Sequence, residues 1–238
     1  MENLCPQQQK RDICSMPAET QSLNYRETID LLHQLQIEPQ AHVVRLEAKK
    51  HKVIGYDQAG EVCWDLRLPL PMPDLKESEQ DFHAYIDRIP IAPPDYLLAL
   101  IQMGASALGY FEEGEVVVHK AIKKYMKRHK RGKAQISYLN TRGKSKAGSR
   151  IRLANTIRFF EEINERLTEW EEDYLPERII YSCTPQLWGL LFQSKVSPPF
   201  EKKDPRLVKV PKDVGVPTFE ELLAINEFVL KGEFRQMR

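Results

Sequence analysis

Residues 96–125 read YLLALIQMGASALGYFEEGEVVVHKAIKKY, and the expected fold follows from this stretch. Its first two runs, 96–103 and 105–111, are rich in apolar residues and have the length of buried strands. The turn sequence EEGE, residues 112–115, then leads into a third run over 116–125. The stretch therefore predicts three consecutive β-strands that are joined by short turns.

Beyond residue 150 the pattern alternates between helix and strand. Apolar residues recur every three or four positions from Leu153 to Trp170, which predicts one apolar face of a long helix. Thr218, with Glu221 three residues later, has the sequence of a helix N-cap. Strands followed by strand–helix alternation predict an α/β (α+β) fold with helices that flank a mixed sheet. The other expected elements are strands over 178–183 and 207–210 and helices over 184–193 and 219–230.

The N-terminal third differs in composition from the rest. Residues 1–20 are polar and contain three consecutive glutamines, which predicts a disordered tail. Prolines then cluster twice before residue 95. Because proline interrupts both helices and strands, these clusters suggest a domain boundary. We therefore expect a disordered tail over 1–20, a small N-terminal α+β region over 21–94, and a larger domain over 95–238. The elements expected before the boundary are helices over 23–35 and 77–87 and strands over 42–48, 52–56 and 62–68.

The composition is that of an ordinary soluble protein, with 42% hydrophobic and 29% charged residues among 238. The N-terminus lacks the pattern of a secretory signal, and the apolar run over 97–108 is too short for a membrane span. The four cysteines, Cys5, Cys14, Cys63 and Cys183, form no C-x-x-C pair, so no metal site is indicated. We expect free thiols in a reducing cytoplasm.

Charge is distributed very unevenly along the chain. No acidic residue lies between Val118 and Glu161, and residues 120–152 hold 13 Lys and Arg. The rest of the chain has 22 basic residues against 34 acidic ones. A basic segment attached to an acidic body predicts contact with a polyanion, because each neutralised phosphate releases counterions. Residues 126–150 show little apolar periodicity, which predicts a long functional loop.

The basic segment and its flanks carry an ordered series of motif residues: a His-Lys pair, a Tyr, a basic run into Arg-Gly-Lys-Ala-Gln, an Ala-Gly pair, and an Asn at the start of the long helix. This series resembles the Vms/ANKZF-type release-factor-like domain (VLRF family), which is related to the central domain of eukaryotic and archaeal translation termination factors. The resemblance covers about residues 97–230, and its specific part lies over 119–170. The matching positions are His119, Lys120, Tyr125, Arg128, Arg131, Gly132, Ala134, Gln135, Ala147, Gly148, Arg150 and Asn155.

The resemblance implies an RNase H-like mixed sheet that lacks the metal carboxylates of that fold. It also implies that a loop bearing Gln135 enters the peptidyl-transferase centre and releases nascent chains from stalled, split ribosomes. The expected function is thus a cytoplasmic ribosome-rescue peptidyl-tRNA hydrolase, a monomer whose partners are the large ribosomal subunit and peptidyl-tRNA. No cofactor and no metal are expected. One departure is that Lys133-Ala134 precedes the glutamine where the termination factors have Gly-Gly.

The residue chemistry agrees with this interpretation. A glutamine side chain is not a base near neutral pH, but its amide holds a water molecule and its backbone N–H donates a hydrogen bond. Small neighbours allow close approach of the backbone, and Lys and Arg contact phosphates. The expected catalytic residues are Gln135, Gly132 and Ala134, with loop support from His119, Lys120, Tyr125 and Asn155. The expected RNA-binding residues are Arg128, Lys130, Arg131, Lys133, Arg142, Lys144, Lys146, Arg150 and Arg152.

Two other functions fit the same residues. The first is an endonuclease that cuts the CCA acceptor end of tRNA, an activity linked to the same family. The second is a ribosome- or RNA-binding module without catalysis, in which Gln135 has no chemical role. Within the segment, His119 and His129 are also readable as a general base pair or as metal ligands, and Tyr125 as a platform for a base.

Overall fold

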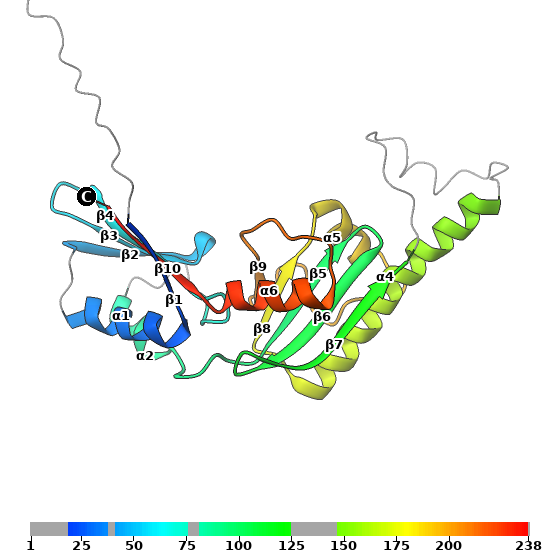
Figure 1. Cartoon of the computed structure of the whole chain (residues 1–238), viewed down its shortest axis with the longest axis horizontal. Coiled ribbons are helices and arrows are strands. Elements are labelled where there is room, and N and C mark those ends of the chain that lie inside the picture. Colours follow the sequence, from blue (N-terminus) through cyan, green and yellow to red (C-terminus); the bar gives the residue numbers. More distant parts are fainter. Residues whose placement is uncertain (1–18, 38–40, 76–80, 125–146, 238) are drawn as a thin grey trace, which may run out of the picture.

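The computed structural model describes residues 19–37, 41–75, 81–124 and 147–237. In these residues the chain forms two five-stranded sheets with helices packed on them, which confirms the predicted α+β class with a helix-flanked mixed sheet (Figure 1). The RNase H-like detail stays a prediction. Within the described ranges, no helix combines the length and apolar character needed to span a membrane.

The second sheet contains the three strands that the sequence of residues 96–125 predicted. Its first three strands form two antiparallel hairpins, and its last two run parallel to the central strand. The spatial order is β7 (Glu115–Lys123), β6 (Ala105–Glu112), β5 (Tyr96–Gln102), β8 (Arg178–Ser182) and β9 (Leu207–Lys209).

This topology brings four strand ends together. Because β5 and β7 are both antiparallel to β6, they run in the same direction as each other and as β8 and β9. All four therefore end at one edge of the second sheet, which we call the carboxyl edge. In open α/β sheets this is the edge at which ligands bind.

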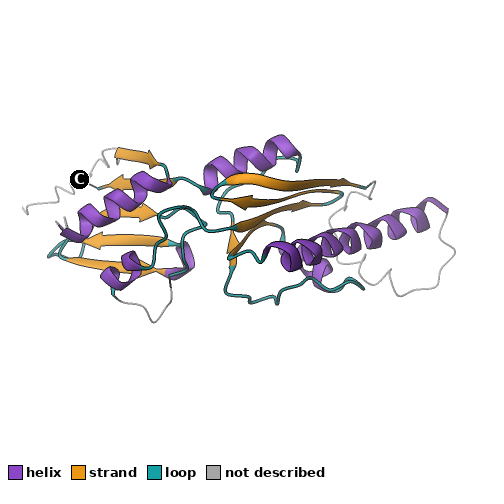
Figure 2. Ribbon diagram, turned by 90° about the horizontal axis from the view of Figure 1, so that it is seen from below, coloured by secondary structure: helices purple, strands orange, loops and turns teal. Residues whose placement is uncertain are grey.

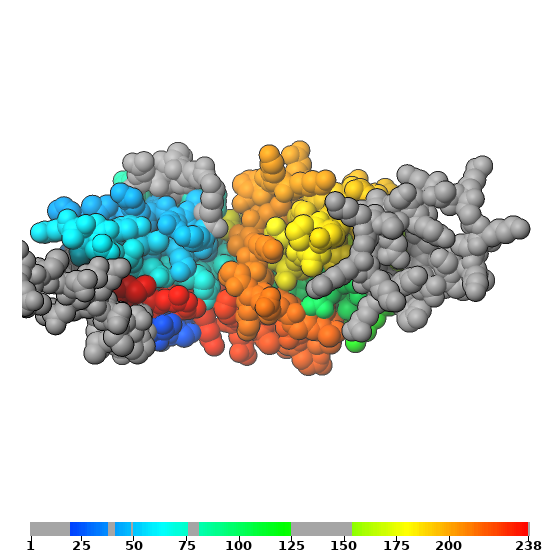
Figure 3. All heavy atoms as spheres, turned by 90° about the horizontal axis from the view of Figure 1, so that it is seen from above, coloured from blue at the N-terminus to red at the C-terminus, as the bar shows by residue number. Residues whose placement is uncertain are grey.

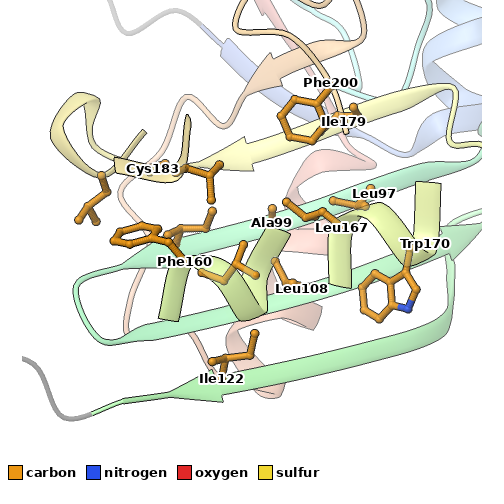
Figure 4. Close-up of a cluster of buried hydrophobic side chains, with 14 of the residues drawn as sticks. Leu97, Ala99, Leu108, Ile122, Phe160, Leu167, Trp170, Ile179, Cys183 and Phe200 are labelled. Carbon is orange, nitrogen blue, oxygen red and sulfur yellow. The ribbon is translucent and has the colours of Figure 1, made fainter. Parts of the chain in front are cut away.

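Two helices sandwich the second sheet, as Figure 2 shows: α4 (Ala147–Tyr174) covers one face and α6 (Phe219–Val229) the other. Side chains of alternate residues of the central strand, β5, point to the two faces of the sheet, as in any pleated strand. Leu97 and Ala99 join the cluster under α4, and Leu98 joins the one under α6. Figure 4 shows the α4 side, where Phe160, Leu167 and Trp170 meet Leu97, Ala99, Leu108 and Ile122.

The helix ends follow the chemistry of the nearby residues. Thr218 Oγ1 accepts a hydrogen bond from the Glu221 amide at 3.2 Å, as predicted for an N-cap. The Glu221 carboxylate in turn accepts a hydrogen bond from the Gly215 amide at 2.7 Å. The predicted loop over 126–150 ends early, because α4 already begins at Ala147 and alanine favours helix. The shorter α5 (Pro185–Phe192) begins behind its cap, Thr184, as its sequence predicts.

The first sheet draws on both ends of the chain. Its helices, α1 (Tyr25–Ile37) and α2 (Phe82–Asp87), pack on one face, and a short 3-10 turn, η1 (Ala48–Lys50), joins two strands. The sheet is antiparallel throughout. The order is β1 (Glu19–Leu23), β10 (Gly232–Gln236), β4 (Val62–Arg67), β3 (Lys52–Tyr56) and β2 (Val43–Glu47).

The position of β10 differs from the sequence-based expectation. The expected parts place its residues in the larger domain and Glu19 in the disordered tail, whereas the structure pairs Glu19 with Gln236 inside the first sheet. Both strands are short and mostly polar, so neither shows a clear alternation in sequence. Figure 3 shows two adjoining lobes, with β10 (red) beside the first sheet (blue and cyan).

A backbone hydrogen bond joins the part that contains the first sheet to α6 on the second: the Leu70 amide donates to the Val229 carbonyl at 2.8 Å. Beside it, within the first part, the His51 ring Nε2 lies 3.0 Å from the Pro69 carbonyl oxygen. His51 is only 7% exposed. Burial, together with nearby Arg178, lowers the pKa of His51 from its usual 6.5 to about 3. The ring is therefore neutral in the folded protein at neutral pH.

We expect His51 to make the protein sensitive to mild acid. Below about pH 6.5 the unfolded chain binds a proton at His51, whereas the folded chain does not until about pH 3. Stability is therefore fully present above pH 6.5 and falls as the pH drops, by up to about 1.4 kcal/mol per pH unit. His51→Asn, which tolerates the left-handed backbone there, should lose less stability than wild type between pH 6.5 and 5 in urea titrations. His42→Asn, at an exposed histidine, is the control, and equal losses in His51→Asn and wild type would contradict this role.

The approach of α6 to the second sheet depends on Gly109. A Cβ there would lie 2.8 Å from both Leu222 Cδ2 and the Phe111 ring, and both side chains are buried. Gly109→Ala should therefore cost about 1–3 kcal/mol in urea unfolding. Gly189→Ala, in α5 with no atom near the new Cβ, should gain about 0.5–1 kcal/mol. Equal stabilities of the two variants would show that α6 moves to accommodate the added methyl group at residue 109 without loss of stability.

Candidate functional site

The basic segment leaves the second sheet at the carboxyl edge, after β7, and the chain returns in α4. Residues 125–146 between them, to which the name basic segment refers from here on, lie outside the described residues, and so do the side chains of Arg150 and Arg152. The predicted catalytic and RNA-binding roles in this segment therefore stay predictions. The residues concerned are Tyr125, Arg128, Lys130, Arg131, Gly132, Lys133, Ala134, Gln135, Arg142, Lys144 and Lys146.

The point of departure is anchored to α4. Lys124 Nζ lies 2.7 Å from Glu162 Oε2, and the Lys124 amide donates to the Gly104 carbonyl at 3.0 Å. Lys124 is the last described residue before the segment, while Glu162 lies well inside the helix that follows it. The ion pair therefore joins the two flanks of the basic segment directly.

From this anchor α4 projects beyond the core. The helix begins fifteen residues before Glu162, which corresponds to about 22 Å along its axis at 1.5 Å per residue. Among its described side chains, Phe159 is the first that is buried. Figure 1 shows the N-terminal end of α4 extending past the strands. We call residues 147–158 the α4 projection; the basic segment joins its tip.

His119 and Lys120 lie in the middle of β7, on opposite faces. His119 pairs with Gly109, and its exposed ring stacks on Phe219 with centroids 3.9 Å apart and planes 21° apart. Lys120 lies between Val118 and Ile122, both of which pack against the α4 core, so alternation places it on the α4 face. The two side chains therefore do not form a joint catalytic pair.

The predicted position of Asn155 needs a correction. The sequence suggested that it lies at the start of the long helix, whereas α4 begins eight residues earlier, at Ala147. Asn155 is half-buried and belongs to the α4 projection, where a helix-start role does not apply. Its predicted support of the segment stays a prediction.

Sequence reasoning missed the partners of β7 and of the residue that follows it. Phe219 comes from α6, a hundred residues after His119, and Glu162 comes from the middle of α4. Neither contact leaves a local signal, because each joins residues that are distant in sequence. Next to Phe219, hydrogen bonds from the Glu220 amide and the Thr218 hydroxyl lower the pKa of Glu220, and nearby Lys123 adds to the shift.

The described part of the chain holds no group of three or more His, Cys, Asp or Glu side chains placed to bind a metal. Cys63 and Cys183 form no disulfide among the described residues, and Cys5 and Cys14 lie outside them. Burial raises the pKa of the Cys183 thiol to about 12, so it stays protonated at neutral pH. Cys183 is therefore unsuited to act as a nucleophile.

The region from β5 to the C-terminus matches a known family. A sequence profile of the Bacteroidetes VLRF1 release factor family aligns with residues 96–237, which is more than half of the chain. The chain belongs to this family. The matched region includes β7, the basic segment and α4, so the resemblance to a VLRF release-factor-like domain is confirmed.

Curated relatives align with about half of the chain. The tRNA endonuclease ANKZF1 of Mus musculus is 29% identical over 133 residues, which are 55% of this chain and 18% of that protein. The Homo sapiens protein of the same name is 30% identical over 134 residues, with the same shares. The chain thus spans under a fifth of these relatives. A solved structure, the Vms1 mitochondrial localization core, covers 82% of this VLRF1 chain and 77% of its own, at 14% identity and a TM-score of 0.44.

We expect the exposed cations that flank the segment to contribute to RNA binding. Lys120 and Arg158 are both exposed and lie in the acid-free stretch. Lys120→Glu and Arg158→Glu should each weaken tRNA binding. The removal of one phosphate contact should also reduce the slope of log binding constant against log salt concentration by roughly 0.7–0.9 in magnitude. Arg26→Glu, at an exposed position of α1, is the matched control. Slopes and affinities equal to those of wild type, measured over a range of KCl concentrations, would exclude these two residues from the interface.

Proposed function

We propose that this VLRF1 family member is a ribosome-rescue peptidyl-tRNA hydrolase in which Gln135 is the key residue. The observation that carries the proposal is the place of the basic segment within the matched release-factor region. It interrupts that region between β7 and α4: it follows the carboxyl edge and leads into the α4 projection, which spans about 18 Å along the helix axis. A basic segment at the tip of a projecting helix suits a site that lies deep inside a large ribonucleoprotein.

The chemistry required is modest. Peptidyl-tRNA is an ester, and its hydrolysis needs a positioned water and donors for the developing oxyanion. The amide of Gln135 holds the water, and its backbone N–H donates to the oxyanion. Gly132 and Ala134 leave room for close approach. In this scheme the ribosome and the tRNA supply most of the active site, and the protein delivers one side chain.

The partners in this proposal are the large ribosomal subunit and peptidyl-tRNA, with the protein acting as a cytoplasmic monomer. The 13 Lys and Arg of residues 120–152 support a polyanionic partner, because phosphate contacts orient a protein on RNA without reading sequence. The proposal needs neither a cofactor nor a metal.

A second function is favoured by one observation: the mouse and human relatives are both named tRNA endonucleases. On that alternative the same segment would bring the acceptor end of tRNA to a phosphodiester cleavage instead of an ester hydrolysis. Incubation of stalled large subunits that carry peptidyl-tRNA with the purified protein separates the two. An intact CCA end on the released tRNA supports ester hydrolysis, whereas a tRNA that lacks terminal nucleotides supports the endonuclease.

We expect Gln135→Ala to abolish peptide release while ribosome binding and stability stay close to those of wild type. The substitution removes the water-holding amide, whereas truncation of a side chain away from a core shifts stability by only about 0.5 kcal/mol. Gln193→Ala, at the C-cap of α5, is the matched control. The measurement is single-turnover release from ribosome-bound peptidyl-tRNA. Release by Gln135→Ala at the wild-type rate would remove Gln135 from the mechanism.

A further inference from the structure

The strand that leads into the basic segment is an edge strand. β7 has β6 on one side and, in the described part of the sheet, no strand on the other. The end of an edge strand frays unless other groups hold it. Two independent contacts act on this strand, one on each face of the sheet: the first at its middle residue, His119, and the second at Lys124, directly after its last residue.

On the α6 face, Phe219 holds His119. Phe219 is the first residue of α6 and directly follows the cap, Thr218, whose hydroxyl fixes the helix start. The two rings lie nearly parallel with centroids 3.9 Å apart. Because the opposite residue on β6, Gly109, has no side chain, Leu222 can pack over it and bring α6 close enough for this stacking.

On the α4 face, Glu162 holds Lys124 through the 2.7 Å ion pair. Lys124 precedes the basic segment and Glu162 belongs to the helix that follows it, so this contact couples the end of the strand to α4. A tilt of about 3° at this point would displace the start of α4, about 22 Å away, by about 1 Å. Displacements of that size can reduce the rate of an enzymatic step about 100-fold.

We propose that Glu162 and Phe219 are positioning residues that aim the basic segment at its substrate. Together with Lys124 and His119 they form what we call the root clamp. This inference rests on the proposed peptidyl-tRNA hydrolase function. The clamp residues do not touch the reacting ester; they fix the strand end and the helix between which the segment is held.

The ion pair is suited to a geometric role rather than to a stabilising one. The Lys124 and Glu162 side chains are 32% and 37% exposed, and such pairs contribute little to folding. Variants of this pair should therefore remain folded. A loss of activity in them would report on geometry and not on global stability.

The decisive test is a charge swap. Lys124→Glu and Glu162→Lys should each lower the maximal single-turnover rate of peptide release about tenfold or more, measured at several enzyme concentrations on ribosome-bound peptidyl-tRNA. The double variant, which restores the pair in reverse, should recover most of that rate. Glu165→Lys, the same charge change on an exposed residue one turn along α4, should keep the wild-type rate.

Phe219 gives a second, uncharged test of the same idea. Phe219→Ala removes the surface on which His119 stacks and should lower the maximal rate, whereas Phe219→Tyr retains the ring and should keep the rate. Hydrogen exchange of residues 119–124 provides a readout that does not depend on activity. We expect faster exchange there in Glu162→Lys and Phe219→Ala than in wild type, with the core of the second sheet unchanged.

The outcomes separate the clamp from the function on which it rests. If wild type releases no peptide, the hydrolase proposal fails, and exchange at 119–124 still shows whether the clamp holds the strand. If wild type is active and the single charge variants lose affinity but keep the maximal rate, the positioning role is wrong. Failure of the double variant to recover while both single variants are slow would also overturn it.

Discussion

Burial of the central strand β5 on both faces is the constraint on which the second sheet depends. Residues 96–101 are all buried, and each large apolar side chain contributes about 1.5–3 kcal/mol when it leaves water. A strand that is apolar on both faces needs a cover on each, and α4 and α6 provide it. Their positions then determine what reaches the carboxyl edge: α6 presents Phe219 to β7, and α4 presents Glu162. The candidate site is thus a consequence of how the core is covered.

Much of this core could be predicted from the sequence, because its signals are local. The apolar runs of β5 and β6 and the recurring apolar face of α4 are readable within windows of 10–20 residues. The helix α4 starts earlier than its sequence predicts, because the residues just before Leu153, which include Arg150 and Arg152, show little apolar periodicity. The contacts of the candidate site, His119 with Phe219 and Lys124 with Glu162, were out of reach, because the sequence does not show which distant side chains the packing of two helices brings together.

The family relation and the architecture divide the chain at different places. The release-factor match begins at β5 and runs to residue 237, so it includes β10. Yet β10 pairs with β1 and β4, which precede the matched region. The matched region therefore supplies an interior strand to the sheet of its N-terminal neighbour. The bond between Leu70 and Val229 and the buried His51 lie where the two parts meet, which ties the first sheet to the unit that carries the candidate site.

The place of β10 also bears on the order in which the molecule is made. Synthesis proceeds from the N-terminus, so β1 and β4 are made long before β10, the strand that lies between them. Until β10 emerges, β1 lacks a partner strand and β4 has one free edge, and exposed edges of this kind invite wrong pairings. The second sheet also waits, because α6, which covers one of its faces, ends only two residues before β10 begins. The first sheet of this protein therefore reaches its native pairing only after the whole matched region has been made.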